Sequence, residues 1–258
     1  MQSLTRNGVK LFFEEAGSGD PPILLVHGWT CDHTYMAPQF EHFRRSHRVI
    51  AVDLRGHGQS DKPQQDYTML AFADDLAWLC EQLKVERPVV VGHSMGGVIA
   101  VELAARFPEI PGAVVTLDSP IVPPQELLDG VAAPTIAALR GPDYREVQRR
   151  MVAEMLFLPT DDPTRKVRIV DAMSSAPQHV MASAFEGIFC DTAASVAACK
   201  VPLLILMAAQ PLSDVAGLRQ VCPTAIIGQT VGAGHFHQLE VPEQVNAMVD
   251  RFLTVSLS

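Results

Sequence analysis

The stretch that decides the fold is "VERPVVVGHSMGGVIAVELAARFPE", residues 85–109. Near its start lies a continuous apolar run, Pro88–Val91, which is typical of a strand buried on both faces of a parallel sheet. A helix-like run follows Ser94. Between the two lies "GHSMG", a G-x-S-x-G pattern centred on Ser94. This order of strand, turn and helix indicates a sharp corner at which the serine hydroxyl stands clear of the sheet.

The glycines of the pattern give this corner a physical reason. Gly92 and Gly96 lack the Cβ atoms that would collide in so tight a turn. The following helix offers free N–H groups and a positive dipole end to a developing oxyanion. The pattern alone is weak, and its context adds most of the force. The alternative is a glycine-rich turn in which Ser94 only caps the helix.

Short strands alternate with helices on both sides of this stretch. Asn7-Gly8 favours a two-residue hairpin turn near the start of the chain. The alternation implies right-handed crossovers and a mostly parallel sheet. From about residue 120 to 200 the helical signals continue without a convincing strand, so we expect an α/β core formed by residues 1–119 and 201–258 with a helical cap insertion at 120–200. The expected strands lie within 21–28, 47–58, 87–92, 112–120, 201–207 and 224–231, and the clearest helices are 36–46, 67–85, 94–107, 144–157 and 242–253.

Composition narrows the classes of function. The chain has 258 residues, of which 48% are hydrophobic and 19% charged, with a net charge of −9. An acidic chain without a basic stripe argues against nucleic acid and anionic membranes as partners. The start lacks a signal-peptide pattern, and the five cysteines form no CxxC motif. We therefore expect a cytoplasmic protein with reduced thiols. No metal-ligand or nucleotide-binding pattern stands out, so we expect no metal and no cofactor.

Three further motifs follow expected strands. His27-Gly28-Trp29 comes after one strand, the glycine-rich stretch Asp53–Pro63 after the next, and His235 lies in the loop after the last strand. Open α/β sheets bind their ligands at the carboxyl ends of strands. We therefore expect these motifs to gather around Ser94.

Together the four motifs give the chain its resemblance to the α/β-hydrolase superfamily, and within it to the esterase, lactonase and perhydrolase group. The resemblance covers essentially the whole chain and implies a mostly parallel sheet flanked by helices, with a helical cap. It implies Ser94 as nucleophile and His235 as general base, with the backbone N–H groups of Trp29 and Met95 as the oxyanion hole. The physical logic agrees, because an imidazole can take the hydroxyl proton while two N–H donors meet the tetrahedral oxyanion.

The third member of the expected triad departs from the family pattern. The family usually carries an aspartate in a G-x-x-D turn after the strand at 201–207, but here Ala208–Pro211 ends in proline. Two aspartates are candidates. Asp118 ends an earlier strand, as the acid does in some branches of the superfamily, whereas Asp214 lies three residues beyond the proline. We favour Asp118 because a strand end is a rigid mount; it could instead cap the following turn, and Asp214 could be a solvated charge or a helix cap.

The sequence thus predicts a carboxylesterase-like hydrolase that cleaves a small to medium ester or lactone through an acyl-enzyme, with a small-molecule acyl compound as its partner. The alternatives are a cofactor-free dioxygenase or C–C bond hydrolase using His235 and Asp118, and a ligand-binding receptor. His33 and His237 are weaker candidates for the pocket, and His27 and His93 are expected to be hydrogen-bonding supports. Several apolar residues of the expected cap either face the pocket, which would favour an apolar substrate, or pack the cap onto the sheet: Met151, Met155, Leu156, Phe157, Phe185 and Phe189.

Overall fold

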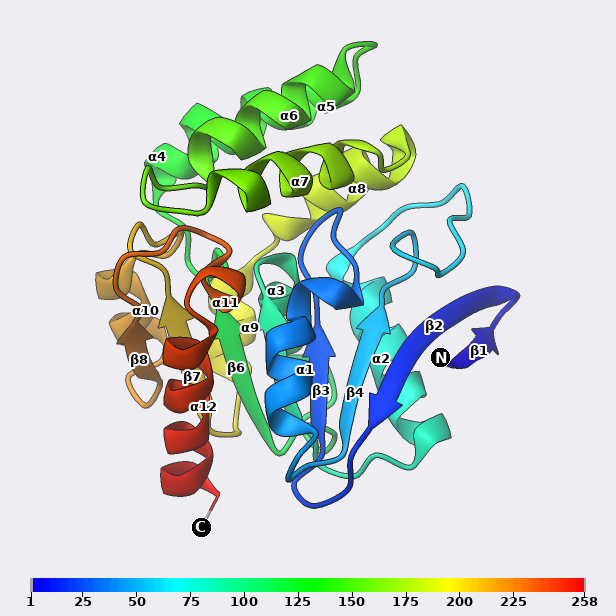
Figure 1. Cartoon of the computed structure of the whole chain (residues 1–258), viewed down its shortest axis with the longest axis vertical. Helices are drawn as coiled ribbons and strands as arrows, with labels where there is room; N and C mark the ends of the chain where they lie inside the picture. Colours follow the sequence, from blue (N-terminus) through cyan, green and yellow to red (C-terminus); the bar gives the residue numbers. More distant parts are fainter. Residues whose placement is uncertain (1, 258) are drawn as a thin grey trace.

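The computed structural model describes residues 2–257 and contains one eight-stranded sheet flanked by helices (Figure 1). The strand order is β1-β2-β4-β3-β5-β6-β7-β8. The β1–β2 and β2–β4 pairs are antiparallel and the others are parallel. The α/β class and the mostly parallel sheet are therefore confirmed. The strands are β1 Gln2–Arg6, β2 Val9–Ala16, β3 Ile23–Val26, β4 Val49–Asp53, β5 Val89–His93, β6 Ala113–Leu117, β7 Leu203–Met207 and β8 Ile226–Gln229.

The hairpin forms where the sequence predicts it. Asn7 and Gly8 both have positive φ, 49° and 81°, as a type I′ turn requires at its two central residues. Arg6 pairs with Val9 across the turn.

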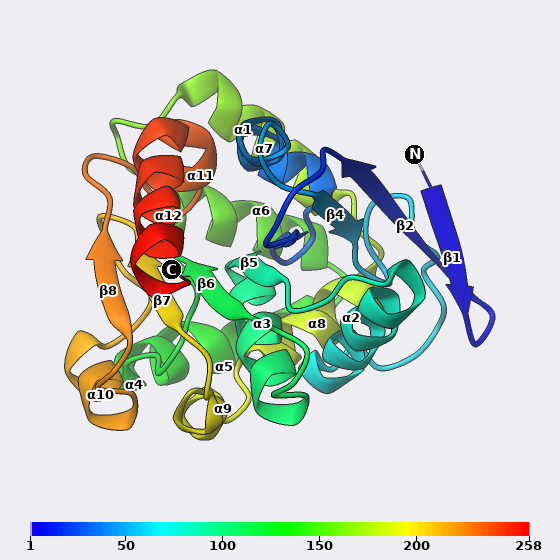
Figure 2. The ribbon, with the colours of Figure 1, turned by 90° about the horizontal axis from the view of Figure 1, so that it is seen from below.

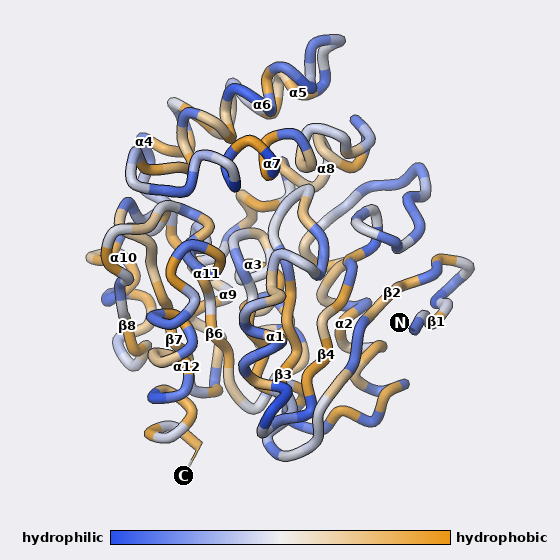
Figure 3. Tube along the Cα trace, viewed as in Figure 1, coloured by the Kyte–Doolittle hydropathy of each residue, from blue (hydrophilic) through white to orange (hydrophobic). Residues whose placement is uncertain are grey.

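Helices cover both faces of the sheet, whose central strands are buried and hydrophobic (Figure 3). One face packs against the apolar stripes of α1 and α12, which lie on the same side of the sheet in the view from below (Figure 2). The other face packs against α2 and α3. The helices of this core are η1 His33–Met36, α1 Ala37–Phe43, α2 Met69–Leu83, α3 Met95–Arg106, α10 Val215–Val221, α11 His237–Glu240 and α12 Pro242–Ser256.

The chain between β6 and β7 is helical and holds no strand among its described residues. Most of its helices lie beyond the carboxyl ends of the parallel strands (Figure 1). The sequence singled out one helix here, at 144–157, whereas the structure has several short ones. They are α4 Gln125–Leu127, η2 Leu128–Ala132, α5 Ala133–Leu139, α6 Tyr144–Met155, α7 Pro163–Ser174, α8 Gln178–Ile188 and α9 Thr192–Ala198.

Between residues 2 and 257, no single helix has both the length and the apolar character needed to cross a membrane. One bent pair of helices, α8 with α9, passes the same test of length and composition.

Candidate active site

Ser94 occupies the corner between β5 and α3 in a strained backbone conformation. Its φ is 53° and its ψ is −119°, a region that side-chain-bearing residues rarely adopt. A Cβ on Gly92 would collide with the carbonyl of Gly96, and a Cβ on Gly96 would collide with the carbonyl of Val26. Gly92 is therefore required by the turn, as predicted, whereas Gly96 is required by the close approach of β3. The Ser94 side chain makes no capping hydrogen bond to α3, so the helix-cap alternative does not account for this serine.

His235 is held by a buried carboxylate. Its Nδ1 lies 2.7 Å from Oδ2 of Asp118, and the two side chains are 6% and 1% exposed. Since a carboxylate only accepts, Nδ1 carries the proton and Nε2 is the basic nitrogen. Ser94 and His235 line the same cavity. No hydrogen bond joins these two side chains within the described residues; in unliganded enzymes such bonds often tighten only when substrate binds.

Asp118 is positioned at the end of β6 by hydrogen bonds to the end of β7. It has a φ of 43°, and its backbone N–H donates to the Leu206 carbonyl at 2.8 Å. Its Oδ1 accepts the Ala208 N–H at 3.0 Å, which leaves Oδ2 for His235. Asp214, by contrast, is exposed and caps α10 by accepting two backbone N–H groups. The structure therefore brings Asp118 to the histidine and leaves Asp214 as a helix cap.

The loop after β3 lies against the serine corner. A Cβ placed on Gly28 would be 3.2 Å from Cβ of Ser94, so the backbone leading into Trp29 passes beside the nucleophile candidate. Met95 is the first residue of α3, and the first N–H groups of a helix have no partner within it. The two N–H groups predicted for an oxyanion hole thus belong to segments that meet at Ser94. The Trp29 indole N–H donates to the Met181 carbonyl at 2.9 Å, which ties this loop to α8.

His93 and His27 are hydrogen-bonding supports, as expected. His93 Nε2 lies 3.0 Å from the His235 carbonyl oxygen, and because a carbonyl accepts, Nε2 carries the proton. Burial lowers the pKa of His93 well below its usual value, which keeps this ring neutral. His93 therefore links the Ser94 corner to the backbone of the histidine loop. His27 Nδ1 lies 2.7 Å from the Gly28 carbonyl and its Nε2 accepts the Leu54 N–H at 3.1 Å.

The cavity at Ser94 and His235 is small, about 70 Å³, and almost entirely apolar. Five of the six apolar residues singled out in the expected cap line it; Phe157 instead stacks on Phe236 with ring centroids 5.2 Å apart. His33 and His237 are not among its lining residues: His237 is buried against Thr230. No sequence motif predicted a place in this lining for five of its residues: Pro120, Leu127, Val131, Ile188 and Leu212. The lining residues are Trp29, Ser94, Pro120, Leu127, Val131, Met151, Met155, Leu156, Phe185, Ile188, Phe189, Leu212 and His235.

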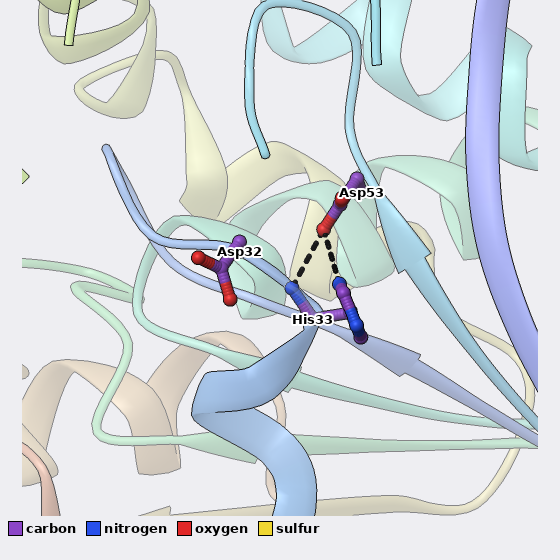
Figure 4. A group of neighbouring side chains, drawn as sticks. All are labelled: Asp32, His33 and Asp53. Carbon is purple, nitrogen blue, oxygen red and sulfur yellow. Dashed lines mark hydrogen bonds and ion pairs between the residues drawn. The ribbon is translucent and has the colours of Figure 1, made fainter. Parts of the chain in front are cut away.

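Asp32, His33 and Asp53 form a separate cluster whose potential ligand atoms lie within 4.8 Å of one another (Figure 4). Asp53 Oδ1 accepts from both the backbone N–H and Nδ1 of His33, at 2.7 and 2.8 Å. Its Oδ2 accepts the Gln59 N–H. Asp32 caps η1 through Thr34. The hydrogen bond to Asp53 raises the pKa of His33. These bonds fasten the loop after β3 to the end of β4, which is a structural role.

Residues 21–147 match the model of the alpha/beta hydrolase fold family. The structure superposes on a thermophilic esterase from Thermogutta terrifontis with a TM-score of 0.87 and 26% identity, covering 100% of both chains. It superposes on an enol-lactonase from Burkholderia xenovorans LB400 with a TM-score of 0.86 and 26% identity, covering 98% of this chain and 100% of that one. The chain belongs to the alpha/beta-hydrolase superfamily. The fold and family predicted from the sequence are confirmed.

Sequence relatives divide into partial and full-length matches. An uncharacterized protein of Mycobacterium tuberculosis is 42% identical over 117 residues, which are 43% of this chain and only 32% of that relative. The 2-(acetamidomethylene)succinate hydrolase of Mesorhizobium japonicum is 29% identical over 267 residues, covering 95% of this chain and 92% of that protein. The Mesorhizobium japonicum relative, the enol-lactonase and the esterase are named for hydrolytic activities.

Proposed function

We propose that this α/β-hydrolase is a serine hydrolase that cleaves a small, largely apolar carboxylic ester or lactone. The observation that carries the proposal is the His235–Asp118 pair, which lines one cavity with a serine held in a strained strand-to-helix corner. A nucleophile and an orienting acid at strand ends, with a base on the loop beside them, are the parts that acyl transfer needs. The esterase and lactonase among the structural relatives support the same reaction class.

The chemistry proceeds in two balanced halves. Ser94 Oγ attacks the substrate carbonyl while Nε2 of His235 takes the hydroxyl proton. The oxyanion of the tetrahedral intermediate is met by the N–H groups of Trp29 and Met95. The intermediate collapses, and His235 gives its proton to the departing alkoxide, which leaves an acyl-serine. Water then attacks the acyl carbon, again losing its proton to His235, and the carboxylic acid departs as Ser94 regains its proton.

Asp118 contributes by orientation and charge. Its bond to Nδ1 holds the tautomer in which Nε2 is basic, and its negative charge stabilises the imidazolium formed in each half-reaction. In this proposal residues 120–200 act as the cap that supplies the apolar wall of the cavity. The relatives do not favour the dioxygenase, C–C hydrolase or receptor alternatives.

The test is turnover of a para-nitrophenyl ester series, acetate to octanoate, by the wild type and Ser94→Ala. We expect loss of at least about ten-thousandfold in kcat for the variant, with an unchanged melting temperature. A fluorophosphonate should add to the wild type at Ser94, as located by peptide mass spectrometry, and should not add to Ser94→Ala. Unchanged turnover in a folded Ser94→Ala variant would refute the proposal.

A further inference from the structure

The cavity beside Ser94 offers no charged partner to a substrate. Apart from Ser94 and His235, its lining side chains are apolar, and none of the lining residues is an aspartate, glutamate, lysine or arginine. The indole N–H of Trp29 is the one further polar side-chain group in the lining, and it already donates to the Met181 carbonyl at 2.9 Å. A carboxylate held in this cavity would therefore find no cation and no free side-chain donor beyond the reacting groups.

The charge around the cavity is also unfavourable to an anion. The ionised Asp118 that holds His235 places a negative charge directly behind the base, and the chain as a whole carries a net charge of −9. Taking an unpaired carboxylate out of water costs several kilocalories per mole even after the protein relaxes. Neither a salt bridge nor a favourable field offsets that cost here.

From this lining we infer that the enzyme is selective for neutral esters with a short apolar acyl group, and rejects acyl groups that carry a free carboxylate. The inference rests on the proposed function of the same site. It separates this chain from the full-length Mesorhizobium japonicum relative, whose name specifies a substituted succinate and hence a carboxylated substrate. The substrate class of that relative does not transfer to a cavity with no group to receive a carboxylate.

The size of the cavity sets the length of the acyl group. Pockets for drug-sized ligands occupy roughly 300–1,000 Å³, so a cavity of about 70 Å³ suits only a short acyl group. Met151 and Met155 form part of the wall contributed by α6, and methionine side chains adjust their shape readily. Short acyl chains therefore fit with little rearrangement, and longer ones require these methionine side chains to move.

The experiment compares three methyl esters of matched acyl length: methyl butyrate, monomethyl succinate and dimethyl succinate. Acid release by the full-length protein is followed in a pH-stat at neutral pH, where monomethyl succinate is ionised. We expect kcat/KM for monomethyl succinate to be at least about a hundredfold below that for methyl butyrate. Dimethyl succinate, which is larger but neutral, should recover part of the loss, because it removes the charge while keeping the added length.

A variant with a cation at the mouth of the cavity gives a second, independent measurement. Met155 lines the cavity and is 40% exposed at the end of α6, so an arginine there keeps its stem in the wall and its guanidinium in reach of water. Met155→Arg should raise the ratio of monomethyl succinate to methyl butyrate turnover about tenfold, because an arginine can pair with a carboxylate. Met155→Gln, of similar length but neutral, is the matched control and should leave the ratio unchanged.

The outcomes separate the inference from the proposed function. Equal wild-type turnover of monomethyl succinate and methyl butyrate would overturn the selectivity while leaving the serine mechanism intact. Turnover of none of the three esters by a protein whose Ser94 still reacts with a fluorophosphonate would also overturn it. A folded protein that neither turns over the esters nor reacts at Ser94 would refute the proposed function itself. If Met155→Arg does not fold, the wild-type ratio decides alone.

Discussion

Replacing Asp118 with asparagine tests whether the carboxylate sets the tautomer of His235. Oδ1 of Asp118 accepts the Ala208 N–H at 3.0 Å, and Oδ2 faces Nδ1 of His235 at 2.7 Å. In Asp118→Asn the amide oxygen must take the Ala208 position, because the amide nitrogen cannot accept a hydrogen bond. The NH₂ group then faces Nδ1 and forces it to accept, so the proton moves to Nε2. A histidine protonated on Nε2 cannot take the Ser94 proton.

The expected loss in kcat is about ten-thousandfold, which corresponds to about 5 kcal/mol of transition-state stabilisation. The fold should survive, since asparagine tolerates the left-handed backbone that Asp118 adopts at φ 43°. Turnover of para-nitrophenyl butyrate and the melting temperature would be measured together. The matched control is Asp214→Asn, which keeps a good N-cap for α10 and should retain wild-type kcat.

Two results would refute this reasoning. One is a folded Asp118→Asn variant with kcat within tenfold of the wild type, which would mean that the buried carboxylate does not set the histidine tautomer. The other is a collapse of kcat in Asp214→Asn, which would mean that the exposed loop supplies the acid after all.

Two further predictions concern the buried histidines. His93→Leu should lower kcat on para-nitrophenyl butyrate about tenfold to a hundredfold with little change in KM, because the His235 carbonyl loses its donor. His93→Gln can place an amide N–H near the Nε2 position and should recover most of the rate. Equal loss of kcat in both variants would mean that His93 acts through packing alone. Burial lowers the pKa of His57 to about 3 and that of His237 to about 4, and the pKa values of His27 and His93 are also lowered. As the pH falls below the histidine pKa of the unfolded chain, near 6.5, the unfolded chain binds more protons than the folded one. The free energy of unfolding should therefore fall by about 1.4 kcal/mol per pH unit for each such histidine, until the pH reaches its pKa in the folded protein. Melting temperatures should therefore fall from pH 6.5 to 4.5, and His237→Asn should flatten that slope; an unchanged slope would contradict the assignment. His33 acts in the opposite direction, since its raised pKa gives stability that is lost as pH rises above 6.5.

Much of the core could be predicted from the sequence because its signals are local. A buried strand reads as a continuous apolar run, and Asn7-Gly8 specifies a hairpin turn without reference to anything distant. The G-x-S-x-G pattern at Ser94 is also local, although the Val26 carbonyl that Gly96 leaves room for belongs to the distant strand β3. The cap is predicted only as a helical insertion, because no strand separates α7 and α8 along the chain and their positions depend on packing against neighbours.

The amino-acid sequence by itself determined which motif follows which strand, the corner at Ser94 and the loop that carries His235. Only the tertiary structure decided between Asp118 and Asp214, because the choice depends on β6 lying beside β7 and on a backbone N–H from Ala208 that turns one carboxylate oxygen toward His235. Tertiary packing also decided that Met151 faces the cavity while Phe157 stacks on Phe236. Hydrophobicity requires that such side chains be buried, but it is non-directional, and only the packed neighbours determine which surface each one covers.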